Sequence, residues 1–369
     1  MIATNLTPDP QTGIGTWSLP AFQRAMRQGI SRDGHHLYPA FPYTAYAHTT
    51  DADLTALYAF LMTQPAVRHQ PPATQLAFPF NLRPLMALWN ALFHVSEPKP
   101  LPALVNTAQT AIKSGAFDMT IDVQAYQRGA YLVNGLGHCS ACHTPRNALG
   151  AEQGGKAFLS GAVVDGWEAP ALTALSKAPV PWSQAEFYRY LRQGHTQHHG
   201  TANGPMAQIV RELSVVPDED IRAMSVYLAS FTEPVSESQS AQLAAQQVRT
   251  AQANAQALPG PAQRLFNGAC ASCHHDGDGP KLLGINTPLT LSTQLHSDRP
   301  DNLIRTILDG VREPASKDIG FMPAFRYSLS DAQIGELAGY MRQRFAPGKG
   351  DWGDMAGAVG RVRGAGDGY

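Results

Sequence analysis

Two short cysteine motifs constrain this chain more than any other feature. The first is Cys139-Ser-Ala-Cys142-His143, and it returns as Cys270-Ala-Ser-Cys273-His274. In each, a histidine directly follows the second thiol, which is the attachment pattern of a c-type haem. We therefore predict two covalent haems c in this chain. The predicted attachment thiols are Cys139, Cys142, Cys270 and Cys273, and the predicted proximal iron ligands are His143 and His274.

Paired cysteines have two other common uses. They hold structural zinc, and they form redox-active dithiols. Zinc is disfavoured because each pair already has its own histidine at the haem spacing, and because the pairs lie far apart in separate repeats. A thioredoxin-like dithiol is disfavoured because no strand–helix–strand pattern surrounds either motif.

Composition narrows the class of protein. The 369 residues suggest two or three domains, and a hydrophobic content of 43% is enough for packed cores. A net charge of −1 gives no basic excess for nucleic acid.

No apolar run reaches the length of about 18 residues that a membrane span needs. No signal peptide precedes the motifs. Because such haems are attached outside the bacterial cytoplasm, we expect a truncated or mis-started reading frame.

An internal repeat surrounds the motifs. Residues 17–29 align without gaps with residues 182–194 and share Trp, Ser, Phe, two Arg, Gln and Gly. Residues 303–310 are a fainter copy. In each copy, apolar residues recur at helical spacing and a glycine ends the pattern. Ser183 with Glu186 predicts a capping box at the start of the second copy.

Corresponding residues of the three copies can be found by counting forward from each repeated glycine. Twelve residues after it lie Met206 in the second copy, Met322 in the third and Phe41 in the first. A final helix follows each, over residues 50–63, 217–231 and 330–345. Capping boxes are predicted for two of them, at Thr50 with Asp53 and at Ser330 with Gln333.

Met206 and Met322 are the predicted distal iron ligands. Methionine more often fills cores, but both residues lie in polar loops marked by glycine and proline. A thioether ligand raises the reduction potential of a haem. The competing distal ligands for the first haem are His195, His198 and His199.

Other residues have secondary roles in this prediction. Pro280 follows the second motif, and its carbonyl is placed to accept the second N–H of His274. Trp167 and Trp182 are expected either to pack on the first motif's haem or to fill the core. Phe41 cannot bind iron. Either Tyr38, His35 or His36 replaces it, or the first repeat serves only for packing.

The predicted fold is all-α, with tandem cytochrome c-like domains, two complete and one partial. The predicted boundaries are 1–65 for the partial domain without a haem motif, 66–124 for a connector rich in proline and aromatic residues, 125–232 for one cytochrome c domain, 233–259 for a linker, 260–346 for the other cytochrome c domain, and 347–369 for a flexible Gly-rich tail. The aromatic stretch 78–93 is expected to be buried between domains; the alternatives are contact with a membrane surface or with another subunit.

These segments resemble the three-haem cytochrome c subunit of bacterial membrane-bound dehydrogenases, such as those for alcohols, aldehydes and gluconate, and related cytochromes of molybdenum hydroxylases. The resembling pieces are residues 4–15, 33–43, 80–85 and 135–147. The resemblance covers nearly the whole chain. The family's first haem motif and signal peptide are missing, and Phe41 stands where alcohol dehydrogenase members tend to have methionine.

The resemblance implies an electron-transfer subunit on the periplasmic side of the inner membrane. It would carry electrons from a catalytic dehydrogenase subunit to ubiquinone or another cytochrome, and would turn over no substrate alone. A third haem is expected only if the N-terminus is extended. One alternative is a dihaem cytochrome c peroxidase, which needs an open distal position. The other is a zinc-stabilised binding module.

Overall fold

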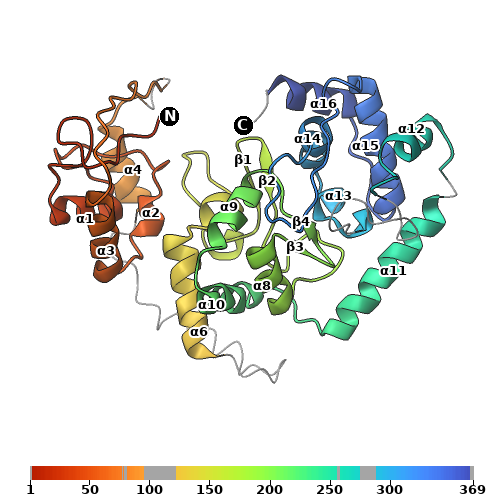
Figure 1. Ribbon diagram of the computed structural model, residues 1–369, viewed down its shortest axis with the longest axis horizontal. Helices are drawn as coiled ribbons and strands as arrows, with labels where there is room; N and C mark the ends of the chain where they lie inside the picture. Colours follow the sequence, from red (N-terminus) through yellow and green to blue (C-terminus); the bar gives the residue numbers. More distant parts are fainter. Residues whose placement is uncertain are drawn as a thin grey trace. The chain divides into compact units, whose positions relative to one another are not determined.

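The chain folds mostly into helices, as a computed structural model shows (Figure 1). The structure describes residues 2–76, 78, 81–94, 122–255, 258–274 and 288–365. It divides into two compact units, Met1–Ala141 and Cys142–Tyr369, so the boundary falls inside the first cysteine motif. No described helix is long and apolar enough to cross a bilayer.

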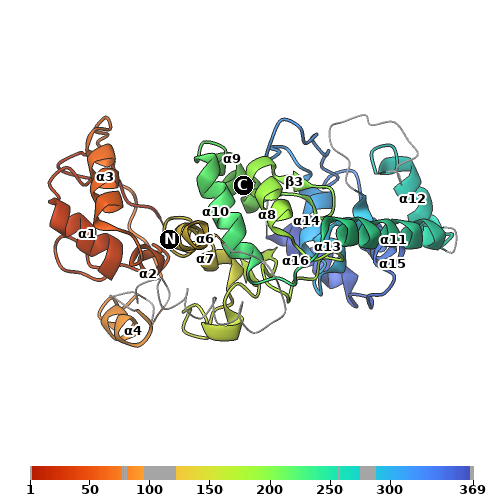
Figure 2. The ribbon, with the colours of Figure 1, turned by 90° about the horizontal axis from the view of Figure 1, so that it is seen from below.

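The first unit contains five α-helices in its described residues and part of a sixth. They are α1 (Leu19–Gln28), α2 (Tyr43–Tyr46), α3 (Asp51–Met62), α4 (Leu85–Phe93), α6 (Val123–Tyr131), a π-helical turn η1 (Leu132–Leu136) and the start of α7 (Ser140–His143). Phe22, Met26 and Leu54 form the core between α1 and α3. Figure 2 shows α4 to one side of α1 and α3. Its Asn90 side chain accepts a hydrogen bond from Tyr43 Oη at 2.5 Å.

The second unit begins with two short hairpins and three helices. They are η2 (Gly155–Ala157), β1 (Ala162–Val164), β2 (Trp167–Ala169), α8 (Gln184–Gln193), β3 (His195–Thr196), β4 (Gly200–Thr201), α9 (Pro205–Leu213) and α10 (Asp218–Ala229). β1 pairs antiparallel with β2, and β3 with β4. Helices α8 and α10 pack against each other.

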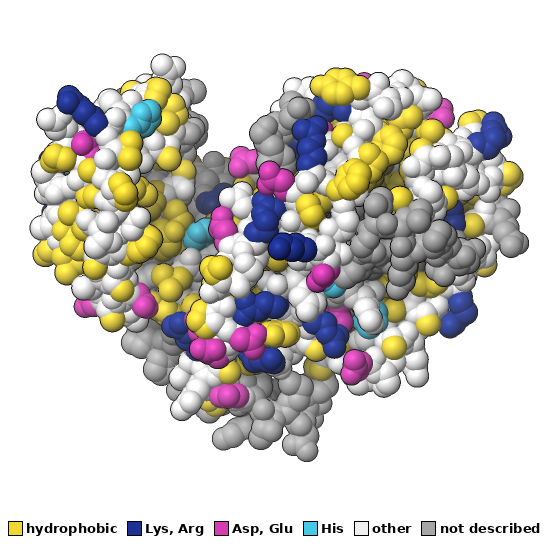
Figure 3. All heavy atoms as spheres, viewed as in Figure 1, with side chains coloured by type: hydrophobic (Ala, Val, Ile, Leu, Met, Phe, Trp, Pro, Cys, Tyr) yellow, Lys and Arg dark blue, Asp and Glu magenta, His cyan; other side chains and the backbone are white. Residues whose placement is uncertain are grey.

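The rest of the second unit is built on one helical core. Its elements are α11 (Glu237–Ala255), α12 (Pro261–Ala269), η3 (Leu289–Leu291), α13 (Thr293–His296), α14 (Asp301–Asp309), α15 (Asp331–Phe345) and α16 (Met355–Gly364). Fully buried side chains of this core include Phe266, Ile304, Leu308 and Ile334. On the face of the second unit that Figure 3 shows, cationic and anionic side chains are interspersed.

The first two repeats are built in the same register. Gly29 and Gly194 both end their helices with positive φ, 63° and 75°. The carbonyl of each accepts a hydrogen bond from the residue eight positions later, Leu37 at 2.7 Å and Ala202 at 2.6 Å. The hairpin that follows also closes at the same offset, Ile30 with His36 and His195 with Thr201. The repeat in the sequence is therefore a repeat in the fold.

The predicted capping boxes form to different extents. Ser330 and Gln333 form the complete reciprocal pair at the start of α15. Ser183 Oγ accepts from the Glu186 backbone N–H at 3.2 Å, which is half of the box. The Glu186 carboxylate lies instead beside Arg189 and two histidines, so the other half does not form.

Two segments are more ordered than their composition suggests. The predicted linker forms α11, which packs on α15 with Ala244 and Ala251 buried. Where the sequence predicts a flexible tail, α16 packs on α14 and α15 with Val359 fully buried. A few small apolar residues on one face are enough here, because α14 and α15 offer a complementary surface.

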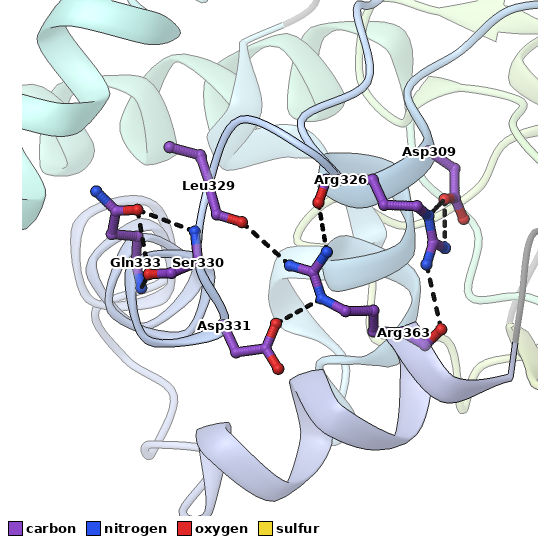
Figure 4. Close-up of polar contacts among 7 residues, drawn as sticks. All are labelled: Asp309, Arg326, Leu329, Ser330, Asp331, Gln333 and Arg363. Atoms are coloured by element: carbon purple, nitrogen blue, oxygen red, sulfur yellow. Dashed lines mark hydrogen bonds and ion pairs between the residues drawn. The ribbon is translucent and has the colours of Figure 1, made fainter.

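Charged side chains also fix α16 (Figure 4). Arg363 donates to the carboxylate of Asp331 at 2.5 Å, to the Leu329 carbonyl at 3.1 Å, and to the Arg326 carbonyl. Arg326 in turn pairs with Asp309 at the end of α14. The network ties the last helix to the ends of α14 and α15.

Candidate haem sites

The first cysteine motif ends in the short helix α7, and His143 is its last residue. His143 Nδ1 lies 2.7 Å from the Pro170 carbonyl oxygen. A carbonyl can only accept, so Nδ1 carries the proton and Nε2 keeps the lone pair that a metal needs. Burial lowers the pKa of His143, which also favours the neutral ligand form. This imidazole fits the role of a proximal iron ligand.

The backbone around His143 is held by the segment that follows it. The Gly161 N–H donates to the His143 carbonyl at 2.8 Å, and the Leu159 N–H donates to Thr144 Oγ1 at 2.9 Å. Leu159 and Thr144 are buried. These bonds place the β1–β2 hairpin, and therefore Pro170 just after it, against the histidine. Pro170 is a residue that the sequence analysis missed. It could have been found by analogy, because the same role was predicted for the Pro280 carbonyl toward His274.

Met206 lies in the first turn of α9, not in the polar loop that the sequence predicted. Gly204 is the N-cap residue of this helix, with φ 55°. The Met206 side chain is half-buried against a small apolar cluster of Ala202, Ala207, Val210, Ala315 and Ile319. Pro205 occupies the first helical position of α9. Proline is favoured at this position because an N–H there would have no intrahelical acceptor, so its absence costs nothing.

The three competing histidines lie around the β3–β4 hairpin. His199 is buried, and its ring stacks on Trp182 with centroids 3.7 Å apart. Burial lowers the pKa of His199 to about 3, so its imidazole is neutral. His198 Nδ1 lies 3.5 Å from the Glu186 carboxylate. His195 is half-buried, and burial lowers its pKa.

The second cysteine motif forms a helical turn at the end of α12. The His274 N–H donates to the Cys270 carbonyl at 2.8 Å, and the Cys273 N–H donates to the same carbonyl at 3.1 Å. Burial, with a smaller contribution from Cys273, raises the pKa of Cys270 to about 11, so its thiol is neutral at pH 7. Pro280, predicted to orient His274, lies outside the described residues.

Met322 pairs with Val311 through two backbone hydrogen bonds of 2.9 and 3.1 Å. Gly310 lies directly beneath, and a Cβ on it would be 2.3 Å from the Met322 carbonyl oxygen. Only glycine fits this position, which explains why the repeated glycine ends α14. The hairpin is longer than in the first two repeats, so the third repeat presents its methionine on a different loop.

In the first repeat, Phe41 packs against Tyr46, with ring centroids 5.5 Å apart. The residues predicted to replace it are engaged elsewhere. Tyr38 lies under the guanidinium of Arg83 at 5.0 Å, and His35 Nδ1 lies 2.6 Å from Asp33. The His36 ring Nδ1 lies 3.3 Å from the side-chain nitrogen of Asn90.

The two tryptophans have different surroundings. Trp182 is buried, stacked on Phe187 and His199. Trp167 is half-buried against Gly204, where a Cβ would come within 2.7 Å of its ring. The guanidinium of Arg305 also lies over the Trp167 ring, 5.2 Å from the ring centroid. Trp167 therefore packs the β1–β2 hairpin, which precedes Pro170, against the segment that begins α9.

Among the described residues, no three His, Cys, Asp or Glu side chains are grouped to hold a metal ion.

Comparisons with known proteins identify the class. Residues 126–232 match the family described as Cytochrome c, and residues 257–341 match Cytochrome C oxidase, cbb3-type, subunit III. The chain is 35% identical to the fructose dehydrogenase cytochrome subunit of Gluconobacter japonicus, over 93% of this chain and 71% of that protein. The chain belongs to the family of cytochrome c subunits of dehydrogenase complexes. Covalently bound haem c and a role in carrying electrons onward follow from this membership, as the resemblance predicted.

Two further relatives extend this result. The gluconate 2-dehydrogenase cytochrome c subunit of Pantoea cypripedii is 32% identical, over 97% of this chain and 78% of that protein. A nicotinate dehydrogenase subunit of Pseudomonas putida is 49% identical over 98% of this chain, which spans 29% of that protein's length. Because these relatives belong to dehydrogenases, the peroxidase alternative is not favoured.

Proposed function

We propose that this chain is a two-haem electron relay built from tandem cytochrome c domains, at residues 125–232 and 260–346. Residues 1–65 are a partial third domain in this proposal. The haem attachment residues are Cys139 with Cys142 and Cys270 with Cys273, and the axial ligand pairs are His143 with Met206 and His274 with Met322. The observation that carries the proposal is the hydrogen bond from His143 Nδ1 to Pro170, which prepares Nε2 for iron.

A bound haem c supplies one-electron chemistry, by cycling its iron between the ferrous and ferric states. The proposed ligands favour electron transfer over catalysis on a substrate. The imidazoles of His143 and His274 and the thioethers of Met206 and Met322 would hold the two irons, and would leave no open site for a small molecule. Thioether ligation would also raise the reduction potential of each haem, which would favour electron uptake.

The electron donor in this proposal is a catalytic dehydrogenase subunit, and ubiquinone or another cytochrome is the acceptor. Identity to the nicotinate dehydrogenase relative is higher than to the fructose and gluconate relatives. We therefore propose a nicotinate-type dehydrogenase as donor. Purified donor with nicotinate should reduce this chain faster than a fructose dehydrogenase with fructose. Equal or reversed rates would contradict this choice of donor.

Haem content tests the relay directly. The full chain, expressed with a haem-attachment system, should show two covalent haems by intact mass. The Cys139→Ala/Cys142→Ala variant should show one haem. Attachment of no haem, or zinc without iron in metal analysis, would contradict the proposal.

We also propose that α4 contacts the periplasmic surface of the inner membrane. Leu85, Leu88 and Leu92 lie on one face of α4 and are 41%, 59% and 61% exposed. No charged residue lies between Leu85 and Phe93. Met86 and Trp89 of the same helix, by contrast, are buried. Burial of the stretch 78–93 between domains stays a prediction. An exposed apolar helix face of this kind supports binding to a lipid interface.

Vesicle binding tests the role of α4. Replacing Leu85, Leu88 and Leu92 together by serine should reduce co-sedimentation with vesicles of anionic phospholipid at least tenfold, because burial of three leucines contributes several kcal/mol. Leu175→Ser is the matched control, because Leu175 is 61% exposed in the other unit. Equal binding by the triple variant and the control would contradict this role.

A further inference from the structure

Arg305 is a buried cation that has no acidic partner among the described residues. It lies in the middle of α14 and is 3% exposed. Its guanidinium makes no hydrogen bond or ion pair with any residue in the part of the chain that the structure describes, and its Nε is buried and unsatisfied. An unpaired buried charge costs several kcal/mol, so a counter-ion is expected.

The acids nearest to Arg305 along the helix are already paired. Asp301 lies one turn before it and binds Arg299 at 3.1 Å. Asp309 lies one turn after it and binds Arg326 at 2.5 Å. At this spacing either acid could reach the guanidinium on a free helix. Both are engaged elsewhere, so the positive charge of Arg305 is left for another group.

The guanidinium lies beside the segments that carry Pro170 and Met206, the residues proposed to act around the haem of the first motif. It lies over the Trp167 ring and against Gly166, where a Cβ would be 2.7 Å from a terminal nitrogen. Trp167 precedes Pro170, the acceptor of His143, by three residues, and packs on Gly204, two residues before Met206. The charge therefore lies next to both segments that deliver the ligands of that haem.

Polar contacts fix the charge in this position. The Asn302 side chain accepts from the Glu168 N–H at 2.9 Å and donates to the Glu168 carbonyl at 2.8 Å. One turn later, Thr306 accepts from Asn203 at 2.9 Å. The Glu168 carboxylate accepts a hydrogen bond from Ser297, and the charged side chain nearest to it is Arg299 and not Arg305.

We infer that Arg305 is the counter-ion of a propionate carboxylate of the haem bound by Cys139 and Cys142. Haem c carries two propionates, and the planar guanidinium matches a carboxylate with paired hydrogen bonds. The inference rests on the proposed function, because it requires haem at the first motif. A residue from the domain of one haem thus sets the charge environment of the other.

Potentiometric titration tests this pairing in the full chain with both haems attached. The Arg305→Gln variant should lower one midpoint potential, because the ferric iron is favoured once the cation is lost. We expect an about tenfold lower ratio of ferrous to ferric haem at fixed potential, which is about 59 mV for one electron. The freed propionate should also have a higher pKa, so this potential should fall with increasing pH near neutrality. The affected haem should be the one whose potential changes in Met206→Phe.

Controls separate the possible failures. Arg312→Gln removes an exposed arginine just after α14 and should change neither potential. If Arg305→Gln leaves both potentials and their pH dependence unchanged, or shifts only the other haem, the inference is wrong. If this variant does not fold, Arg305→Lys keeps the charge but loses the planar fork, so the propionate band in resonance Raman should shift; an unchanged band would overturn the pairing. Intact mass, measured first, shows whether the proposed haem at the first motif itself has failed.

Discussion

The first and second repeats have the same backbone frame and different chemistry. Both end a helix at a glycine with positive φ, and both return through a hairpin in the same register. Twelve residues beyond the glycine, one repeat has Phe41 and the other Met206. The comparison teaches that the frame is held by residues separate from the ligand position. A side chain at that position can therefore change without a change of fold.

The repeated arginines show how the frame is held. Arg192 donates to the carbonyls of Leu213, Ser214 and Val216, at 3.0 to 3.2 Å. Arg27 donates to the Thr49 carbonyl at 2.6 Å and pairs with Asp51 at 2.5 Å. Both therefore fix the chain just before the final helix of their repeat, α10 or α3. Neither arginine lies at the ligand position.

The largest effect is expected from giving the second repeat the first repeat's residue. Met206→Phe removes the proposed sulfur ligand, so the potential of that haem should fall. The ratio of ferrous to ferric haem at a fixed potential should decrease at least about hundredfold, or about 2.7 kcal/mol. Spectroelectrochemistry measures this change, together with loss of the Met-to-iron charge-transfer band from one haem. Retention of that band in both haems would exclude Met206 as a ligand.

A smaller effect is expected from the arginines. Arg192→Ala should reduce the free energy of unfolding by about 2 kcal/mol, because hydrogen bonds from a charged donor contribute about 1.5 to 3 kcal/mol. Arg27→Ala should cost less, about 1 kcal/mol, because its guanidinium has one carbonyl partner and an exposed acid. Chemical denaturation measures both. A larger loss of unfolding free energy for Arg27→Ala than for Arg192→Ala would contradict this account of how the two arginines stabilise their repeats.

The smallest effect is expected from the reverse exchange. Phe41→Met should cost no more than about 1.5 kcal/mol, because both side chains are large and apolar. The haem count and both midpoint potentials should stay unchanged, since residues 1–65 contain no cysteine. Thermal unfolding and the visible spectrum check the two halves of this prediction. A new sulfur-to-iron band would show that the first repeat reaches a haem after all.

The sequence by itself was sufficient for the local features of this protein. The cysteine motifs, the repeated glycines and the cap of α15 depend on residues close together in the chain, so their chemistry can be read from spacing alone. The family resemblance was also accessible, from residues 4–15, 33–43, 80–85 and 135–147. The start of α9 at Pro205 was accessible too, because proline favours a first helical turn, although we expected a loop there.

Only the tertiary structure decided which distant residues meet. Pro170 reaches His143 because a hairpin folds back on α7, and no local pattern marks that particular carbonyl. In the part of the chain that the structure describes, Arg305 has no acidic partner because Asp301 and Asp309 bind other arginines. The last helix, α16, is ordered by the surface on which it packs. The contacts of Pro170 with His143, of Arg326 with Asp309 and of α16 with α14 and α15 join residues far apart in the chain, and their meeting depends on how the elements pack.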